Sequence, residues 1–295
     1  MNNFQLPVTG RTKGYLYIGI AALLWGFIGP FGKMAYAQGI SPLEVAFWRA
    51  VIAWFCFGSE LVLRQKIAPV SRRDLLPLAL FSILCIAMFY GAYQVAVQEV
   101  GAAMASVLLY TAPAWVIFLS RLLLAESITM DKLLALGLTI TGVVCIAIGQ
   151  AGGKSPALST MSLLGLGTGL FSGFCYSLYY ILGKFFAGKY SASLLFFYAL
   201  LPGALMMLPF FTFTEKNPSA WLALVLLSIF STYGAYHFYY AGLVHIEAGR
   251  ASLIATLEPV VAGLAAWYWW GEYFTLPGYA GAILIMLAVL LVVRK

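Results

Sequence analysis

Two stretches of the sequence, "ASVLLYTAPAWVIFLSRLLLAESIT" at residues 105–129 and "ASLIATLEPVVAGLAAWYWWGEYFT" at residues 251–275, align without a gap. Five identical residues stand 146 positions apart in the two stretches: Ala105, Ser106, Pro113, Glu126 and Thr129 against Ala251, Ser252, Pro259, Glu272 and Thr275. Shorter matches lie upstream, "YGAY" at 90–93 and 233–236 and "GK" at 32–33 and 183–184. We therefore predict two related halves, residues 1–154 and residues 155–295.

The composition indicates a membrane protein. Of the 295 residues, 63% are hydrophobic and only 9% are charged, whereas soluble domains carry about 25% charged residues. The sequence holds ten apolar segments near the ~20-residue length of a spanning helix, at roughly 15–37, 43–63, 75–97, 101–121, 133–151, 161–184, 192–213, 220–243, 248–270 and 277–293. Each segment is apolar on all sides, without the alternation of a membrane β-barrel. We expect an all-α polytopic membrane protein with ten transmembrane helices.

The number of helices in each half determines how the halves are oriented. Five is odd, so the second half must enter the membrane from the side opposite to the first. The halves are then two inverted five-helix repeats, an arrangement typical of transporters. Because two inverted copies can exchange conformations, a midplane cavity can open to either side in turn. This predicts alternating access, with the hairpins of helices three to four and eight to nine as gates.

The basic residues orient the predicted helices, because cytoplasmic loops collect Lys and Arg. With the N-terminus inside, the cytoplasmic segments hold 13 of the 17 Lys and Arg residues. Both termini are therefore expected in the cytoplasm, and the chain in the bacterial inner membrane. This bias accounts for the net charge of +7 without a nucleic-acid partner. The expected partners are the lipid bilayer and a small-molecule substrate, and we expect the chain to work as a monomer.

Several features together resemble the drug/metabolite transporter superfamily, EamA type. They are the doubled ten-helix pattern, "WGFIGPFGK" at 25–33, "SPLEVAFWRA" at 41–50, the prolines of helices four and nine, and a Glu followed by a Gly-rich last helix in each half. The resemblance covers nearly the whole chain and is greatest to the YddG-type exporters of aromatic amino acids. It implies that helices one to four and six to nine surround a central cavity, with helices five and ten at the periphery. The four-helix multidrug relatives use a Glu in helix one that this chain lacks, so their proton exchange is not implied.

The ninth apolar segment contains an acidic residue and a proline side by side, Glu258 and Pro259. A charge at that depth costs at least ~2.5–3.5 kcal/mol on insertion scales, so Glu258 should be buried, paired or protonated. It is either a functional group of the cavity or a neutral carboxyl bonded to a neighbouring helix. Pro113 and Pro259 each remove an amide donor and free a carbonyl four residues earlier, either to kink the helix for packing or to contact the substrate.

Aromatic side chains with a polar tip gather in the helices expected around the cavity. Tyr233, His237 and Tyr240 are spaced i, i+4, i+7 and so share one helical face, although some tyrosines of the chain belong to interfacial belts. Arg49 and Lys33 either meet a substrate carboxylate or extend to the membrane surface. The candidate cavity residues are Trp25, Pro30, Lys33, Arg49, Tyr90, Tyr93, Ser106, Tyr110, Pro113, Tyr176, Tyr179, Tyr180, Tyr233, His237, Tyr240, Ser252, Glu258 and Pro259.

Aromatic walls with a few polar groups suit a flat amphipathic substrate such as an aromatic amino acid. We expect an exporter of small amphipathic metabolites; another metabolite, a nucleobase or a drug is the alternative. An intramembrane hydrolase is a remoter one, because no motif frames Ser106 or Ser252 as a nucleophile. A passive channel would call for a ring of identical subunits or a filter loop. The sequence predicts no enzyme activity, cofactor or metal, and leaves open whether Glu258 or His237 carries a proton.

Overall fold

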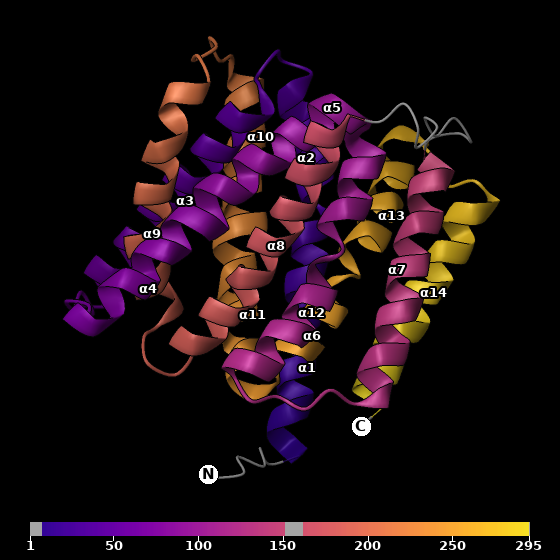
Figure 1. Ribbon diagram of the computed structural model, residues 1–295. Helices are drawn as coiled ribbons and strands as arrows, with labels where there is room; N and C mark the ends of the chain where they lie inside the picture. The colour runs from indigo at the N-terminus through magenta and orange to yellow at the C-terminus, as the bar shows by residue number, and fades with distance from the viewer. Residues whose placement is uncertain (1–7, 151–161, 295) are drawn as a thin grey trace.

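The computed structural model describes residues 8–150 and 162–294, and within these ranges the chain is a helical bundle without a β-strand (Figure 1). The first half consists of α1 (Val8–Gly26), α2 (Ile28–Tyr36), α3 (Pro42–Leu63), η1 (Arg72–Asp74), α4 (Leu75–Leu80), η2 (Phe81–Met88), α5 (Phe89–Leu109), α6 (Ala112–Leu123) and α7 (Met130–Gln150). The second half consists of α8 (Leu163–Phe186), α9 (Ala192–Met207), η4 (Leu208–Phe210), α10 (Pro218–Ser228), η5 (Ile229–Gly234), α11 (Ala235–His245), α12 (Ala248–Ala255), α13 (Glu258–Trp270) and α14 (Leu276–Val293). The predicted boundary between residues 154 and 155 lies outside the described ranges.

Short polar side chains begin several of these helices. Ser41, Ser162, Ser191 and Asn217 each accept a hydrogen bond from an amide in the first turn of the helix that follows. A proline follows directly after Ser41 and Asn217, where its missing N–H costs nothing. These caps fix where the chain re-enters the bundle.

Eight helical segments of the described chain are long and apolar enough to span a membrane: Gly10–Tyr36, Pro42–Leu63, Arg72–Leu109, Met130–Gly149, Ala192–Phe210, Pro218–His245, Ala248–Trp270 and Leu276–Val293. The predicted count of ten is therefore not confirmed. Two differences explain the shortfall. Glycines and tyrosines lower the mean hydropathy of α8, and the predicted third and fourth segments form one helical run from Arg72 to Leu109 followed by the short helix α6.

Local irregularities recur at matching places in the two halves. η2 and η5 are π-helical, and the chain leaves the helix at residues 110–111 and again at 256–257. In each case the next helix has a proline in its first turn, Pro113 in α6 and Pro259 in α13. Within the Arg72–Leu109 run, Gly101 has φ 80° and ψ 159°, so the run turns there. The helices are thus broken where the sequence repeat is clearest.

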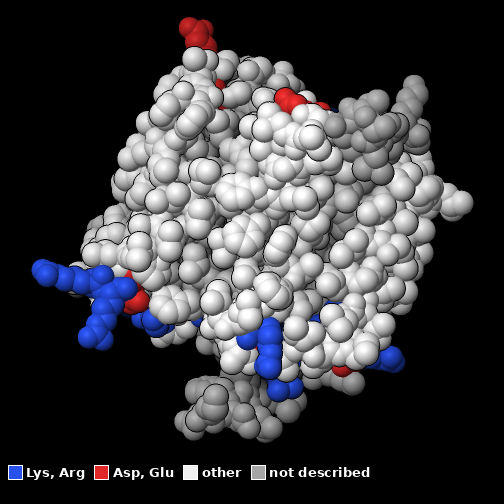
Figure 2. All heavy atoms as spheres, in the orientation of Figure 1, with Lys and Arg blue, Asp and Glu red and all other residues white. Residues whose placement is uncertain are grey.

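The helices pack in a recurring set of pairs. α1 lies against α11, α5 against α8, and α3 against α9, while α7 packs along α14 at one side of the bundle (Figure 1). α1 begins and α14 ends at the same end of the bundle, which we call the terminal end; the opposite end is the far end. The Lys and Arg side chains visible in Figure 2 all lie toward the terminal end.

The close approach of α7 and α14 depends on glycines. A Cβ atom at Gly142 would lie 2.8 Å from the carbonyl oxygen of Gly281 on α14. Gly137, one and a half turns earlier on α7, has no heavy atom within 4 Å of such a Cβ. Substituting each of these two glycines in turn therefore distinguishes the effect of helix packing from that of helix propensity.

We expect Gly142→Val to destabilise the protein by about 1–3 kcal/mol, because overpacking a close contact forces the helices apart. Thermal unfolding of the purified protein in detergent measures this as a lowered Tm. Gly137→Val is the control and should leave Tm nearly unchanged. Equal losses of Tm in the two variants would contradict the packing seen between α7 and α14.

Candidate functional site

A cavity of about 400 Å³ lies inside the bundle. Its lining comes from α1, α2, α3, η2, α5, α7, α8, α11 and α13, so both halves of the chain contribute. The lining includes Tyr36 and Pro42, on either side of the connection between α2 and α3, which lies at the far end in Figure 1. A volume of this size falls within the range of ~300–1,000 Å³ that is usual for small-molecule sites.

Interruptions in three helices lie beside the central cavity. α1 ends at Gly26, and a Cβ atom there would lie 3.2 Å from the backbone nitrogen of Ala262 in α13, closer than most real contacts. Gly26 therefore lets α1 and α13 meet beside the cavity. The cavity is lined by a residue from each of three helix ends: Gly26 at the end of α1, Leu109 at the end of α5 and Glu258 at the start of α13. Interrupted helices are tolerated in a membrane where they face protein or a wet cavity.

Aromatic rings cluster on the wall of the cavity. Trp25 makes edge contacts with Tyr179 and Tyr236, with ring centroids 6.4 and 6.3 Å apart. Tyr179 and Tyr236 are themselves 5.5 Å apart, and Phe89 stacks on Tyr176 at 5.2 Å. Rings in such contacts hold one another in place and present faces and edges to a flat molecule.

The cavity contains one buried cation. Arg49 of α3 is 6% exposed, and its Nε donates to Thr232 Oγ1 at 2.6 Å while Nη2 donates to the Ser231 carbonyl at 3.3 Å. Its guanidinium lies 5.5 Å from the centroid of the Tyr90 ring. These contacts fix the side chain without using a carboxylate, since Arg49 forms no ion pair with the rest of the described chain.

The cavity also contains one carboxyl group. Glu258 is the first residue of α13, where the helix dipole favours a negative charge. The Tyr110 hydroxyl lies beside it, and Arg49 is close enough to interact with it electrostatically. Like Arg49, Glu258 is absent from the ion pairs that the described residues make. Two opposite charges thus face one space with part of their bonding capacity unused.

The structure brings ten of the predicted residues to this cavity: Trp25, Arg49, Tyr90, Tyr93, Ser106, Tyr110, Tyr176, Tyr179, Glu258 and Pro259. Tyr93 and Ser106 face each other across the Gly101 turn, 3.2 Å apart between their oxygens. Pro113, Tyr180 and Ser252 line an adjoining gap that has no room for a water molecule. Pro30 is buried in α2.

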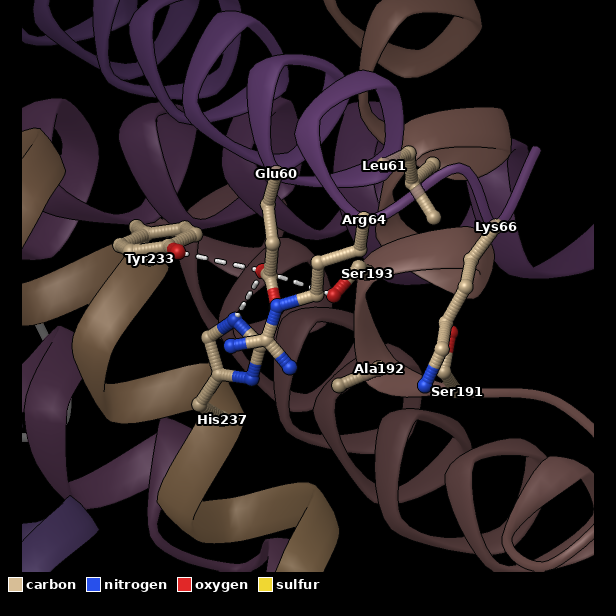
Figure 3. Close-up of a pocket in the computed structure, with 9 residues that line it drawn as sticks. All are labelled: Glu60, Leu61, Arg64, Lys66, Ser191, Ala192, Ser193, Tyr233 and His237. Carbon is tan, nitrogen blue, oxygen red and sulfur yellow. Dashed lines mark hydrogen bonds and ion pairs between the residues drawn. The ribbon is translucent and has the colours of Figure 1, made fainter.

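The remaining candidates lie elsewhere. Tyr233 and His237 do share a face, but it lines a second cavity around Glu60 (Figure 3), and Tyr240 is 4% exposed in the core. Lys33 is half exposed at the far end, where it pairs with Glu272 and lies 4.6 Å from the Trp270 ring centroid.

Sequence reasoning missed several polar residues of the two cavities, among them Tyr36, Gln94 and Tyr236 in the central one and Glu60 in the second. The repeat carried the signal for Tyr236, because it is the counterpart of Tyr93 in the two "YGAY" motifs. Glu60 was signalled by its place inside the apolar segment 43–63, since an ionisable residue at membrane depth is a candidate for function.

Polar contacts close the bundle at the terminal end. Glu126 accepts hydrogen bonds from the amides of Ala248 and Gly249, the first two residues of α12, at 2.7 and 3.1 Å. Lys132, 2% exposed, lies 3.8 Å from the same carboxylate. Lys184 donates to the carbonyls of Leu243 and Ile246 at the end of α11. The α11–α12 hairpin is therefore tied to α8 and to the segment that follows α6.

The groups that line the central cavity are suited to binding a small molecule. Among the described residues, no group of three or more His, Cys, Asp or Glu side chains is placed to hold a metal ion. The cavity instead offers a guanidinium, a carboxyl group, several phenol hydroxyls and aromatic faces. These groups can hold an amphipathic molecule that carries both charges.

Comparisons with known proteins agree with this architecture. A solved crystal structure superposes with a TM-score of 0.82 at 18% identity, covering 95% of this chain and 96% of that one. An uncharacterized transporter of Archaeoglobus fulgidus is 31% identical over 284 residues, covering 96% of this chain and 97% of that protein. The uncharacterized inner membrane transporter YicL of Salmonella typhimurium is 25% identical, covering 95% of each chain. The model of the EamA-like transporter family matches residues 12–148 and 163–294, and the chain belongs to this family of membrane transporters.

Proposed function

We propose that this transporter exports small amphipathic amino acids, aromatic ones above all, across the inner membrane by alternating access. The observation that carries the proposal is the pair of unpaired opposite charges, Arg49 and Glu258, on the wall of one aromatic cavity. An amino acid carries a carboxylate for Arg49, an ammonium group for Glu258 and a side chain for the rings. A neutral nucleobase carries no charged group that could pair with Arg49 or Glu258.

The binding geometry favours a planar carboxylate at Arg49. Its Nε is already engaged by Thr232, which orients the guanidinium and leaves other N–H donors for a ligand. Arginine binds carboxylates through two parallel hydrogen bonds, which adds specificity to the charge attraction. The Tyr90 ring beside the guanidinium limits the orientations that it can take.

We further propose ten spanning helices in two inverted repeats, residues 1–154 and 155–295. The two matches of the family model and the packing pairs support this. Exchanging the halves turns the pair α1 with α11 into the pair α8 with α5, and leaves α3 with α9 and α7 with α14 unchanged. α12 packs against α6 in the same way. The residues after Gly101 together with α6 form one additional span in the first half, and α8 forms one in the second. Each half then has five spans.

The two ends of the bundle support alternating access because equivalent residues are engaged differently. By the offset of 146, Glu126 corresponds to Glu272, and the amides of Ala248 and Gly249 correspond to those of Ala102 and Ala103. Glu126 holds both of its amides, whereas Glu272 pairs with Lys33 and Ala102 lines the open cavity. In the opposite state, Glu272 takes the amides of Ala102 and Ala103, and Glu126 releases its own. Such a conformational step sets turnover in many transport and enzyme cycles.

The charge distribution supports the orientation. Cytoplasmic segments of membrane proteins collect Lys and Arg, and these residues gather at the terminal end in Figure 2. With that end in the cytoplasm, the cavity described here opens outward. The inner membrane fits the name of the relative YicL.

Recognition of both charges predicts a specific pattern of competition. In proteoliposomes loaded with labelled tryptophan, we expect tryptamine and indole-3-propionate to compete at least about tenfold less well than tryptophan, because each lacks one charged contact worth ~1.5–3 kcal/mol. Arg49→Gln should lose discrimination against tryptamine, and Glu258→Gln should lose discrimination against indole-3-propionate.

The matched control is Glu215→Gln, which changes an exposed carboxylate outside both cavities and should compete as the wild type does. If tryptamine or a nucleobase competes as well as tryptophan in the wild type, the amino-acid assignment fails while membership of the family stands.

The unequal gates predict opposite effects of two matched substitutions. Glu126→Gln weakens two charge-assisted hydrogen bonds, each worth ~1.5–3 kcal/mol, so it should shift the population toward opening at the terminal end by roughly tenfold or more. Glu272→Gln should leave the described state favoured. Distances between spin labels at Leu123 and Val244, and at Gln98 and Tyr273, would measure the two ends in a variant whose native cysteines are replaced by serine. Identical distance distributions in wild type and Glu126→Gln would contradict the gate assignment.

A further inference from the structure

A second cavity of about 310 Å³ lies between the end of α3, the start of α9 and the η5–α11 segment (Figure 3). It has no lining residue in common with the central cavity. Glu60 and Arg64 enter it from the first half of the chain, and Ser193, Tyr233 and His237 from the second. Figure 3 shows these side chains converging on the carboxylate of Glu60.

Glu60 is the centre of a four-donor cluster. Its Oε2 lies 2.8 Å from Ser193 Oγ, 3.1 Å from the Tyr233 hydroxyl and 2.8 Å from His237 Nε2, while Arg64 Nε lies 3.2 Å from its Oε1. The Glu60 side chain is only 10% exposed. Because an ionised carboxylate only accepts hydrogen bonds, these contacts are satisfied together when Glu60 is charged and His237 carries a hydrogen on Nε2.

His237 is then the group able to change charge in this cluster. An unperturbed imidazole titrates near neutral pH, and the His237 side chain is 32% exposed in the cavity. The charged groups facing it are the carboxylate of Glu60, which favours an added positive charge, and the cations Arg64 and Lys66, which oppose it. The other titratable neighbours are Tyr233 of η5 and, next to Tyr233, Cys56 of α3; α9 contributes only Ser191 and Ser193 as polar side chains.

The same two segments join this cluster to the substrate cavity. α3 carries both Glu60 and Arg49, about 16 Å apart along the axis at 1.5 Å per residue. The η5–α11 segment carries their partners, Tyr233 and His237 for Glu60, and Ser231 and Thr232 for Arg49. A change in the contacts of Glu60 with Tyr233 and His237 can therefore alter the orientation of Arg49, because α3 and the η5–α11 segment connect the two sites.

We propose that the Glu60–His237 pair is a proton-binding site that couples transport to the pH at the terminal end. A proton from water adds to Nδ1 of a neutral His237, the Nε2 hydrogen keeps its bond to Glu60, and the neutral contact becomes an ion pair across α3 and α11. Loss of the proton restores the neutral contact. The coupling rests on the transport function proposed above, whereas the binding of the proton does not.

The proton site is tested first without any substrate. The chain has two histidines, His237 and His245, so the imidazole NMR signals of isotope-labelled protein in lipid nanodiscs are assignable with His237→Gln. Spectra are recorded from about pH 5 to pH 8, where imidazoles generally change charge, and the His237 ring should gain a proton at Nδ1 as the pH falls, with Nε2 protonated throughout. Glu60→Gln should displace that titration. A His237 ring that keeps one charge state over this range overturns the proposal.

The coupling is tested by exchange of labelled tryptophan in proteoliposomes over the same pH range. A one-proton step changes the protonated fraction about tenfold over two pH units centred on its midpoint, and the wild-type rate should follow this change. His237→Gln should have a flat profile because its amide keeps a donor for Glu60 without titrating. His245→Gln is the control on the same helix, and it should keep the wild-type profile because His245 lies outside this cavity, near Tyr17.

The outcomes separate the two proposals. Tryptophan exchange with a His237 that keeps one charge state overturns the proton site. An unchanged pH profile of exchange in His237→Gln overturns the coupling. Both outcomes leave amino-acid transport standing. A titrating His237 in a protein that exchanges no amino acid supports the proton site and overturns the assigned substrate.

Discussion

Hydrocarbon cannot supply hydrogen bonds to a backbone, and this constraint shapes the whole molecule. Every amide and carbonyl at membrane depth needs a partner within the protein or in water. The chain meets the requirement with helices almost everywhere. It interrupts them at a few places, including residues 110–111 and 256–257, next to the central cavity. The position of these breaks fits the constraint, because irregular backbone at membrane depth is tolerated where it faces protein or a water-filled cavity.

Charged groups follow the same logic. Arg49, Glu60, Glu126 and Lys132 are buried or nearly so, and each is held by hydrogen bonds or by an opposite charge. Arg49 and Glu258 in the central cavity differ from the others, because each keeps part of its hydrogen-bonding capacity unused and neither forms an ion pair within the described chain. A protein that leaves two opposite charges partly unused in its interior is suited to a ligand that brings the complementary pair.

Composition and the internal repeat were enough to predict a helical membrane protein, because both depend on the chain as a whole, and the resemblance of its motifs added the EamA type. Ten of the predicted cavity residues also lie in the cavity, mostly from helices with regular spacing. The prediction was incomplete for the helix with His237. Spacing predicts which residues share a helical face, but not which cavity that face borders. Tyr236 lies about 100° around the helix from His237, so Tyr236 faces the central cavity, and Tyr233 and His237 face the second one.

Burial of the two gate carboxylates differs, and so does their exposure to dissolved salt. Glu272 and Lys33 are 54% and 50% exposed, whereas Glu126 and Lys132 are 7% and 2% exposed. The Debye length is about 8–10 Å at physiological ionic strength, and salt weakens interactions between exposed charges far more than between buried ones. If these two carboxylates are the gates proposed above, salt in the medium at the far end acts on one of them alone, so the balance between the two ends depends on ionic strength.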